Sequence, residues 1–218
     1  IRKSLVGSEM CIRDSSFLGS SYGERFNGFN FKRFNYCLEL HTEIVTDFIH
    51  DIIIFMVEIH QTVEKIFESN KDKLEAFECK DEFSDTQSFC DHYGFKIEDS
   101  CNAILLKSKK PEEFYGLFCV LGSDRLDVNH KAKSLLGAKK VSFASREEAE
   151  IITNQIYGGI SPLGLPEEIK VYIDENVMLR NKVFIGGGNR ISKFFLKPSD
   201  LKDLTNGEVA ELTQSIST

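Results

Sequence analysis

The sequence contains no uninterrupted apolar run of about 18 residues, the length that a membrane-spanning helix requires. The nearest approach, residues 44–57, is broken by Asp47, His50 and Asp51. We therefore expect no membrane-spanning helix. The hydrophobic content of 41% and the charged content of 28% are those of a soluble globular protein.

The cysteine patterns of zinc and dithiol proteins are also missing. The six cysteines form no C-x-x-C pair and no cluster with histidine at zinc-ligand spacing. We therefore predict neither a zinc site nor a dithiol motif. Reduced, mostly buried thiols in a cytoplasmic protein are the interpretation that remains.

A surplus of positive charge is missing as well, because the net charge is −7. This excludes non-specific nucleic-acid binding that is driven by the overall charge. A local basic face stays open, although charge runs are usually only solvated surface. The lysines that could form such a face are Lys107, Lys109, Lys110, Lys131, Lys133, Lys139 and Lys140.

The first 55 residues differ from the rest of the chain. Ser4 to Ser15 resembles the translation of a transposase-type sequencing adapter, in which ATG TGT ATA AGA GAC encodes Met-Cys-Ile-Arg-Asp. Residues 16–55 show no sustained helical or strand periodicity. We interpret residues 1–55 as an artefact, adapter plus translated upstream sequence, with irregular or disordered structure. The natural protein is then predicted to start at Met56 and to form one domain over residues 56–218.

From Met56 onward, apolar periodicity and capping residues predict helices that alternate with short strands. Helices are predicted over residues 58–70, 86–93, 128–136 and 146–155, and a last short one is capped by Ser199. Gly94 is predicted to lie just past the end of the second helix, and Ser145 and Glu148 are predicted to open the fourth with a capping box. Strands are predicted over residues 74–79, 103–107, 114–121, 140–143, 170–173, 182–185, 194–196 and 208–212. This order predicts an α/β (mixed α+β) fold in a single compact domain.

Glycine and proline gather in one stretch, residues 158–166. These nine residues hold three of the 15 glycines and two of the four prolines. Glycine allows close approach to the backbone, and proline fixes the chain direction. The stretch predicts a loop of set shape whose free N–H groups point at a ligand. The alternative is an ordinary turn between a helix and a strand.

Six short strings carry a family resemblance: Leu-Asp-Val-Asn at 126–129, Leu-Leu-Gly-Ala-Lys-Lys at 135–140, Phe-Ala-Ser at 143–145, Gly-Gly-Ile-Ser-Pro at 158–162, Val-Tyr-Ile-Asp at 171–174 and Gly-Gly-Gly-Asn-Arg at 186–190. Their order and spacing resemble the YbaK/ProX family of aminoacyl-tRNA editing deacylases, which includes the insertion domain of bacterial prolyl-tRNA synthetase. A further string, Asp-Ser-Cys-Asn-Ala-Ile at 99–104, looks like a branch of that family. The resemblance covers about residues 77–212.

The resemblance implies a mixed, partly closed β-sheet surrounded by short helices. It implies hydrolysis of the ester that joins a wrong amino acid to the acceptor end of tRNA, with no metal and no cofactor. The family's Gly-x-x-x-Pro loop falls here on Gly158, Gly159, Ile160, Ser161 and Pro162. Fixed backbone N–H donors in such a loop would stabilise the developing oxyanion, each by about 3–4 kcal/mol.

The chain departs from the family at Asn102. Many members have a lysine at this strand position, and Asn102 carries no positive charge. An asparagine amide could still orient a water or hold the substrate, because it offers two donors and one acceptor oxygen. The alternative is a polar residue at a strand edge without a catalytic role.

The resemblance suggests further contacts, and each has a structural alternative. Asp174 could bind the substrate's ammonium group or could be a turn aspartate. Gly186, Gly187 and Gly188 could approach the terminal nucleotide or could form a tight strand exit; they do not fit a phosphate-binding motif. Ser161 could bind the amino acid or water, but no base near it in the sequence would make it a nucleophile.

Two functional hypotheses follow. The first is a free-standing trans-editing hydrolase, a monomer or weak dimer, in which water attacks the ester of a mischarged aminoacyl-tRNA. The intact loop and the absence of any synthetase domain motivate it. The second is a catalytically weak or inactive module that binds tRNA or protein, because Asn102 replaces the family lysine.

Overall fold

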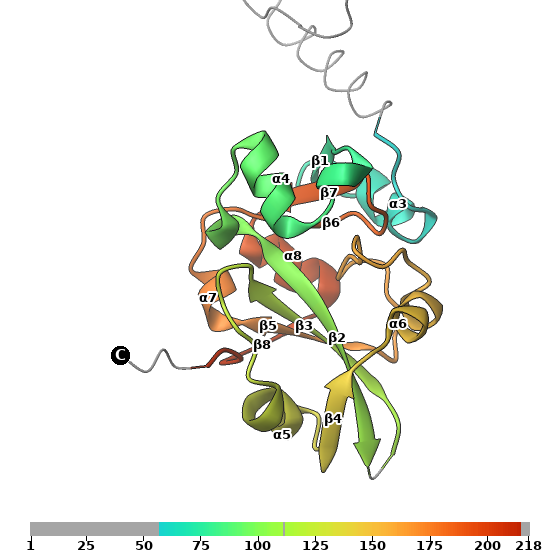
Figure 1. The fold of residues 1–218 in the computed structure, drawn as a ribbon. Helices are drawn as coiled ribbons and strands as arrows, with labels where there is room; N and C mark the ends of the chain where they lie inside the picture. The colour runs from blue at the N-terminus through green and yellow to red at the C-terminus, as the bar shows by residue number, and fades with distance from the viewer. Residues whose placement is uncertain (1–56, 111, 215–218) are drawn as a thin grey trace, which may run out of the picture. The chain divides into compact units, whose positions relative to one another are not determined.

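The structure, a computed structural model, describes residues 57–110 and 112–214 (Figure 1). The interpretation of residues 1–55 and the predicted start at Met56 lie outside these residues. In the part of the chain that is described, no helix is both long enough and apolar enough to cross a membrane.

The described residues form two β-sheets. The smaller sheet is antiparallel and has the strand order β1 (Glu75–Glu78), β7 (Ser192–Leu196), β6 (Val183–Gly186). The larger sheet has the order β4 (Lys140–Phe143), β2 (Cys101–Lys110), β3 (Tyr115–Leu121), β5 (Lys170–Asp174), β8 (Glu208–Ala210). Its first three strands pair antiparallel, and β5 and β8 add in parallel. The predicted mixed α/β class is confirmed.

The predicted single, partly closed sheet needs correction. The two sheets are joined by one parallel bridge, between Ser100 and Phe184, and no further ladder between them forms among the described residues. Past this bridge β6 pairs with β7, whereas β2 pairs with β3 and β4. The sheets diverge because both turn an apolar face toward the same core, and that core separates them.

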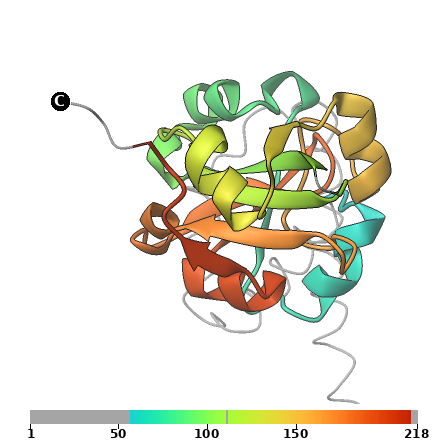
Figure 2. The same cartoon turned by 90° about the horizontal axis from the view of Figure 1, so that it is seen from below.

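Strand alternation gives the sheets their faces, because successive side chains point to opposite sides. In β3, Leu117 and Cys119 enter the core that both sheets share, while Phe118 and Val120 enter a second core. This second core lies under a π-helix (Val128–Ala132) and α5 (Lys133–Leu135), and Figure 2 shows α5 across this outer face of the larger sheet.

The smaller sheet has its own outer core. Phe184 and Phe195 pack there against Phe89 of α4 (Thr86–Tyr93). Figure 1 shows α4 beside β7 and β6. Helix α4 begins where the carboxylate of Asp85 accepts the N–H of Ser88 at 3.1 Å, as a capping side chain does. This cap places the start of α4 near the bridge between the sheets.

Four helices of the described residues contribute to the shared core: α3 (Gln61–Glu68), α6 (Arg146–Thr153), α7 (Glu175–Met178) and α8 (Pro198–Thr205). The predicted capping box of Ser145 and Glu148 opens α6. The predicted cap of the last helix is wrong, because α8 already starts at Pro198 and Lys197 precedes it. Proline suits a first helical position, since its missing N–H would have no partner there.

Candidate functional site

Five segments enclose a cavity of about 270 Å³ at the junction of the two sheets. They are residues 84–86 at the start of α4, residues 100–103 at the start of β2, residues 157–160 after α6, residues 184–186 of β6, and Lys193 of β7. Of the predicted site residues, the cavity brings together Asn102, Gly158, Gly159, Ile160 and Gly186.

One wall of the cavity is bare backbone. The N–H of Gly159 donates to the carbonyl oxygen of Ile156 at 3.0 Å, so it is already engaged. The N–H groups of Gly158 and Ile160 have no hydrogen-bond partner among the described residues. Gly158 has a φ of +86°, which glycine adopts at little cost. This wall therefore offers two fixed donors to a ligand.

Gly159 must be glycine for a reason other than the one the sequence suggests. A Cβ at this position would overlap the carbonyl oxygen of Asn189 rather than enter the cavity. The loop and the segment after β6 thus lie in direct backbone contact. The absence of a side chain at Gly159 therefore lets the backbone of Asn189 approach closely, rather than a ligand.

The second glycine run lies against the first. A Cβ on Gly186 would overlap the carbonyl oxygen of Gly159, and the N–H of Gly188 donates to that same oxygen at 2.8 Å. Gly187 donates its N–H to the carbonyl oxygen of Ser192 at 3.0 Å. Gly186 lines the cavity, whereas Gly187 and Gly188 do not. The run matches the structural alternative, a tight strand exit, and Gly186 also forms part of the cavity wall.

Ser161 and Pro162 lie behind the loop rather than in the cavity. Ser161 is fully buried, its N–H donates to Oε1 of Gln155 at 2.6 Å, and its Oγ accepts the N–H of Leu163 at 3.2 Å. Pro162 lines a different cavity, next to Leu204. Both residues hold the loop in place from outside the cavity.

Asn102 faces the backbone wall from the start of β2, and two hydroxyl groups fix its amide. Thr86 Oγ1 and Ser100 Oγ each donate to Asn102 Oδ1 at 2.8 Å. The amide oxygen is thereby engaged twice. The NH₂ group of Asn102 has no partner among the described residues, so it is left to donate to a ligand.

The cavity contains a cation that the sequence analysis did not identify. Lys193 is only 6% exposed, and its Nζ donates to the carbonyl oxygen of Ser84 at 2.8 Å. Burial lowers the pKa of this lysine. Ser84, Thr86, Ser100 and Tyr157 also line the cavity and were not predicted. The sequence does carry one signal for Lys193, because this lysine directly precedes the apolar run Phe194, Phe195 and Leu196. The structure shows that the whole strand is buried.

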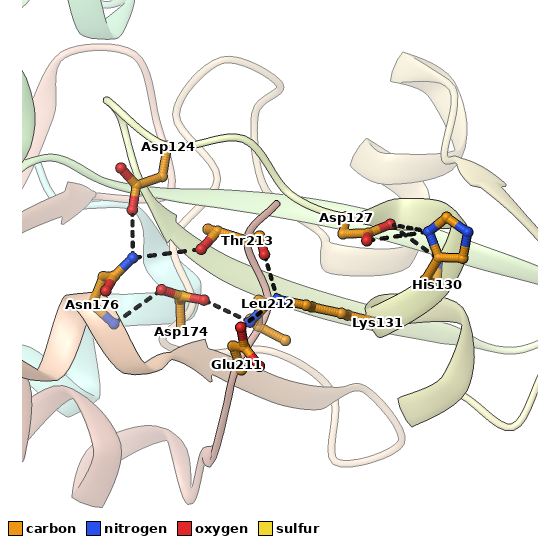
Figure 3. Close-up of polar contacts among 9 residues, drawn as sticks. All are labelled: Asp124, Asp127, His130, Lys131, Asp174, Asn176, Glu211, Leu212 and Thr213. Carbon is orange, nitrogen blue, oxygen red and sulfur yellow. Dashed lines mark hydrogen bonds and ion pairs between the residues drawn. The ribbon is translucent and has the colours of Figure 1, made fainter. Parts of the chain in front are cut away.

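Asp174 is not among the residues that line this cavity, and Figure 3 shows its polar contacts. It is 1% exposed and caps α7 (Glu175–Met178), because its Oδ1 accepts the N–H of Asn176 at 2.9 Å. Its Oδ2 accepts the N–H of Leu212 at 2.6 Å. Each carboxylate oxygen accepts a backbone donor, as expected for the alternative of a turn aspartate.

Other reactive groups near the cavity are inert or engaged. Cys101 lines the cavity, but a hydrogen bond with Cys119 and burial raise the pKa of its thiol, so it stays protonated.

In the described ranges, no three His, Cys, Asp or Glu side chains gather as they would around a metal ion. Among the lysines of the basic face, Lys107 pairs with Glu148 and Lys131 with Glu211.

Comparisons with known proteins identify relatives in sequence. The sequence model of the aminoacyl-tRNA editing domain family matches residues 81–204, more than half of the chain. A protein of Enterococcus faecalis named "Putative Cys-tRNA(Pro)/Cys-tRNA(Cys) deacylase EbsC" is 33% identical over 92 residues, which are 42% of this chain and 56% of that protein. A proline–tRNA ligase of Streptococcus pneumoniae is 30% identical over 106 residues, 44% of this chain and 17% of the ligase. The chain thus spans about half of the first relative and a small part of the second.

Solved structures share the fold. A structure described as a "putative trans-editing enzyme for prolyl tRNA synthetase" aligns with a TM-score of 0.62 at 23% identity, covering 72% of this chain and 100% of the other. A hypothetical protein aligns with a TM-score of 0.64 at 21% identity, covering 71% and 100%. These structures match the two-sheet domain described above.

Proposed function

Because this chain belongs to the aminoacyl-tRNA editing domain family, we propose that it hydrolyses the ester of a mischarged aminoacyl-tRNA in trans. One observation carries the mechanism. Gly158, Ile160 and Asn102 line one cavity, and the N–H groups of the first two and the NH₂ group of the third have no partner among the described residues.

In the proposed reaction, water is the nucleophile. The two backbone donors stabilise negative charge on the carbonyl oxygen as the tetrahedral intermediate forms, without reorganising. Asn102 holds the substrate or orients the water through its amide hydrogens. The buried, engaged hydroxyl of Ser161 and the protonated thiol of Cys101 both favour water over a side-chain nucleophile.

The substrate of the Enterococcus relative gives the first candidate to test. The full 218-residue chain is incubated with tRNA charged with Ala, Ser, Thr, Cys or Pro, including Cys-tRNA(Pro), and amino-acid release is compared with spontaneous hydrolysis. We expect release above background from one or a few of these tRNAs. Release from none by the folded protein would contradict the proposal.

Asn102→Ala should lower the release rate about 100-fold, because it removes the amide donors from the cavity. Asn176→Ala is the matched control: Asn176 lies in the cluster around Asp174 and donates to Asp124 at 2.9 Å, outside the cavity. The control should leave the release rate unchanged. Equal rates for both variants would remove Asn102 from the mechanism.

A second candidate function is binding without hydrolysis. The observation that favours it is the neutral Asn102 at the position where many family members have lysine. It predicts that the chain binds charged tRNA but releases no amino acid, and that Asn102→Lys gains release. Release by the native chain favours the hydrolase instead.

A further inference from the structure

Lys193 is a buried cation without a buried counter-charge. Its Nζ donates to the carbonyl oxygen of Ser84 and lies 5.6 Å from the ring centroid of Phe89. The ion pairs among the described residues all involve other cations, so no carboxylate there pairs with Lys193. An ammonium group has three donors, so two of them have no partner in the described part of the chain.

The groups around Lys193 do not neutralise it. Asp85 also lines the cavity, and its carboxylate caps α4. It forms no ion pair with Lys193, and its negative charge offsets only part of the effect of burial on the ammonium. Arg190 adds a second positive charge nearby and is itself paired with Asp81. The thiols of Cys79 and Cys90 also face Lys193, and burial raises the pKa of each, so both stay neutral. A buried charge in this state is costly unless a ligand pairs with it.

Two further donors in the cavity are unused. The hydroxyl of Ser84 is buried and has no hydrogen-bond partner among the described residues. The NH₂ group of Asn102 is free because its oxygen holds both neighbouring hydroxyls. Ser84, Asn102 and Lys193, the residues that carry these three donors, all line the same cavity. This combination is complementary to an oxygen with negative charge.

We propose that Lys193, Ser84 and Asn102 form an anion-binding subsite that takes an anionic oxygen of the substrate. The proposal deepens the proposed function and rests on it for the identity of that substrate. The positive charge that β2 lacks at Asn102 is then supplied from β7, in the other sheet. Two parts of an aminoacyl-tRNA end carry such an oxygen: the phosphate before the terminal adenosine, and the side-chain carboxylate of an acidic amino acid.

Binding of hydrolysis-resistant analogues tests the subsite without requiring catalysis. The probes are 3′-aminoacylamino-3′-deoxyadenosines in two pairs, alanyl with and without a 5′-phosphate, and aspartyl against asparaginyl without phosphate. Calorimetry on the full chain measures each affinity. We expect the anionic member of one pair to bind at least about tenfold more tightly, as charged hydrogen bonds do, and Lys193→Met to abolish that preference. The pair that shows the preference identifies the source of the oxygen.

Lys182→Met is the matched control. Lys182 also lies over an aromatic ring, 5.5 Å from the centroid of Phe195, but it pairs with Glu75 and does not line the cavity. The Lys182→Met chain should keep the preference for the anionic analogue. Asn102→Asp is a second test of the subsite, since it places a negative charge beside the bound anion and should also remove the preference.

Thermal unfolding separates a binding role from a structural one. Replacing an uncompensated buried charge with methionine should leave the melting temperature of Lys193→Met equal or higher. A lower melting temperature with an unchanged preference would overturn the proposal. So would the absence of any preference in both pairs of the native chain. A preference that depends on Lys193 in a chain that releases no amino acid would refute the hydrolase and leave the subsite standing.

Discussion

Two polar clusters in this domain differ in how completely their hydrogen bonds are satisfied. Around Asp174, both carboxylate oxygens accept backbone N–H groups, and Asn176 donates to Asp124 (Figure 3). Around Asn102, the amide oxygen is engaged, but the amide hydrogens and the ammonium of Lys193 keep unused donors among the described residues. The first cluster joins chain segments, and the second leaves donors for a ligand.

The difference shows why residue type alone does not identify a site. Asp174 and Asn102 are both polar residues at strand ends, and the sequence suggested a ligand contact for each. A buried polar group is stable when it has partners. Whether those partners come from the chain or from a ligand depends on residues far away in sequence, such as Leu212 for Asp174.

The largest expected loss of stability comes from removing the carboxylate of Asp174, whose two oxygens both accept backbone N–H groups. Asp174→Ala leaves the N–H groups of Asn176 and Leu212 without their acceptor, and it removes the cap of α7. The free energy of unfolding should fall by about 3 kcal/mol, measured by urea denaturation. Asp174→Asn keeps one acceptor oxygen and should lose less. Unchanged stability in the alanine variant would contradict the structural role assigned to Asp174.

A smaller loss is expected where the two glycine runs touch. In Gly159→Ala the new methyl group would overlap the carbonyl oxygen of Asn189, so the backbone must shift. Stability should fall by about 2 kcal/mol, and amino-acid release should fall with it because Gly158 and Ile160 move. Gly137→Ala is the control: its Cβ would meet open space, and only its φ of +58° is strained. A Gly159→Ala chain with native stability would show that the contact is not tight.

The smallest effects compare two buried serines. Ser161→Ala removes the acceptor of the Leu163 N–H and should lower stability by about 1 kcal/mol. Ser84→Ala removes a hydroxyl that has no partner among the described residues, so stability should stay the same or rise slightly. Thermal unfolding of the two variants in parallel checks this order. A larger loss of stability in Ser84→Ala than in Ser161→Ala would contradict the hydrogen bond assigned to Ser161 and the lack of a partner assigned to Ser84.

Much of the fold follows from local sequence. The strand over residues 140–143, the capping box of α6 and the end of α4 at Gly94 are local patterns, and the structure confirms them. Helix α7 was missed because it has only four residues and its cap is Asp174, for which the sequence suggested a ligand contact or a turn. The division of the strands into two sheets was not predicted, because it depends on core packing between strands that are distant in sequence.

Less of the candidate site could be predicted. The Gly158–Ile160 wall and Asn102 were found from their local pattern, and the cavity brings them together. Lys193 was not found, because only the arrangement of β7 beside α4 places its ammonium in the cavity. The sequence also did not reveal why position 159 must be glycine, because the carbonyl oxygen that leaves no room for a side chain belongs to Asn189, which is distant in sequence.

The contact between the glycine runs has a consequence for how this cavity can change by mutation. Gly159 and Gly186 have no room for any side chain, so these two positions of the wall cannot be substituted without a shift of the backbone. The opposite wall carries ordinary side chains from α4, β2 and β7 and can accept substitutions singly. Within one such cavity, new substrate preferences can therefore accumulate on one side while the other side stays constant.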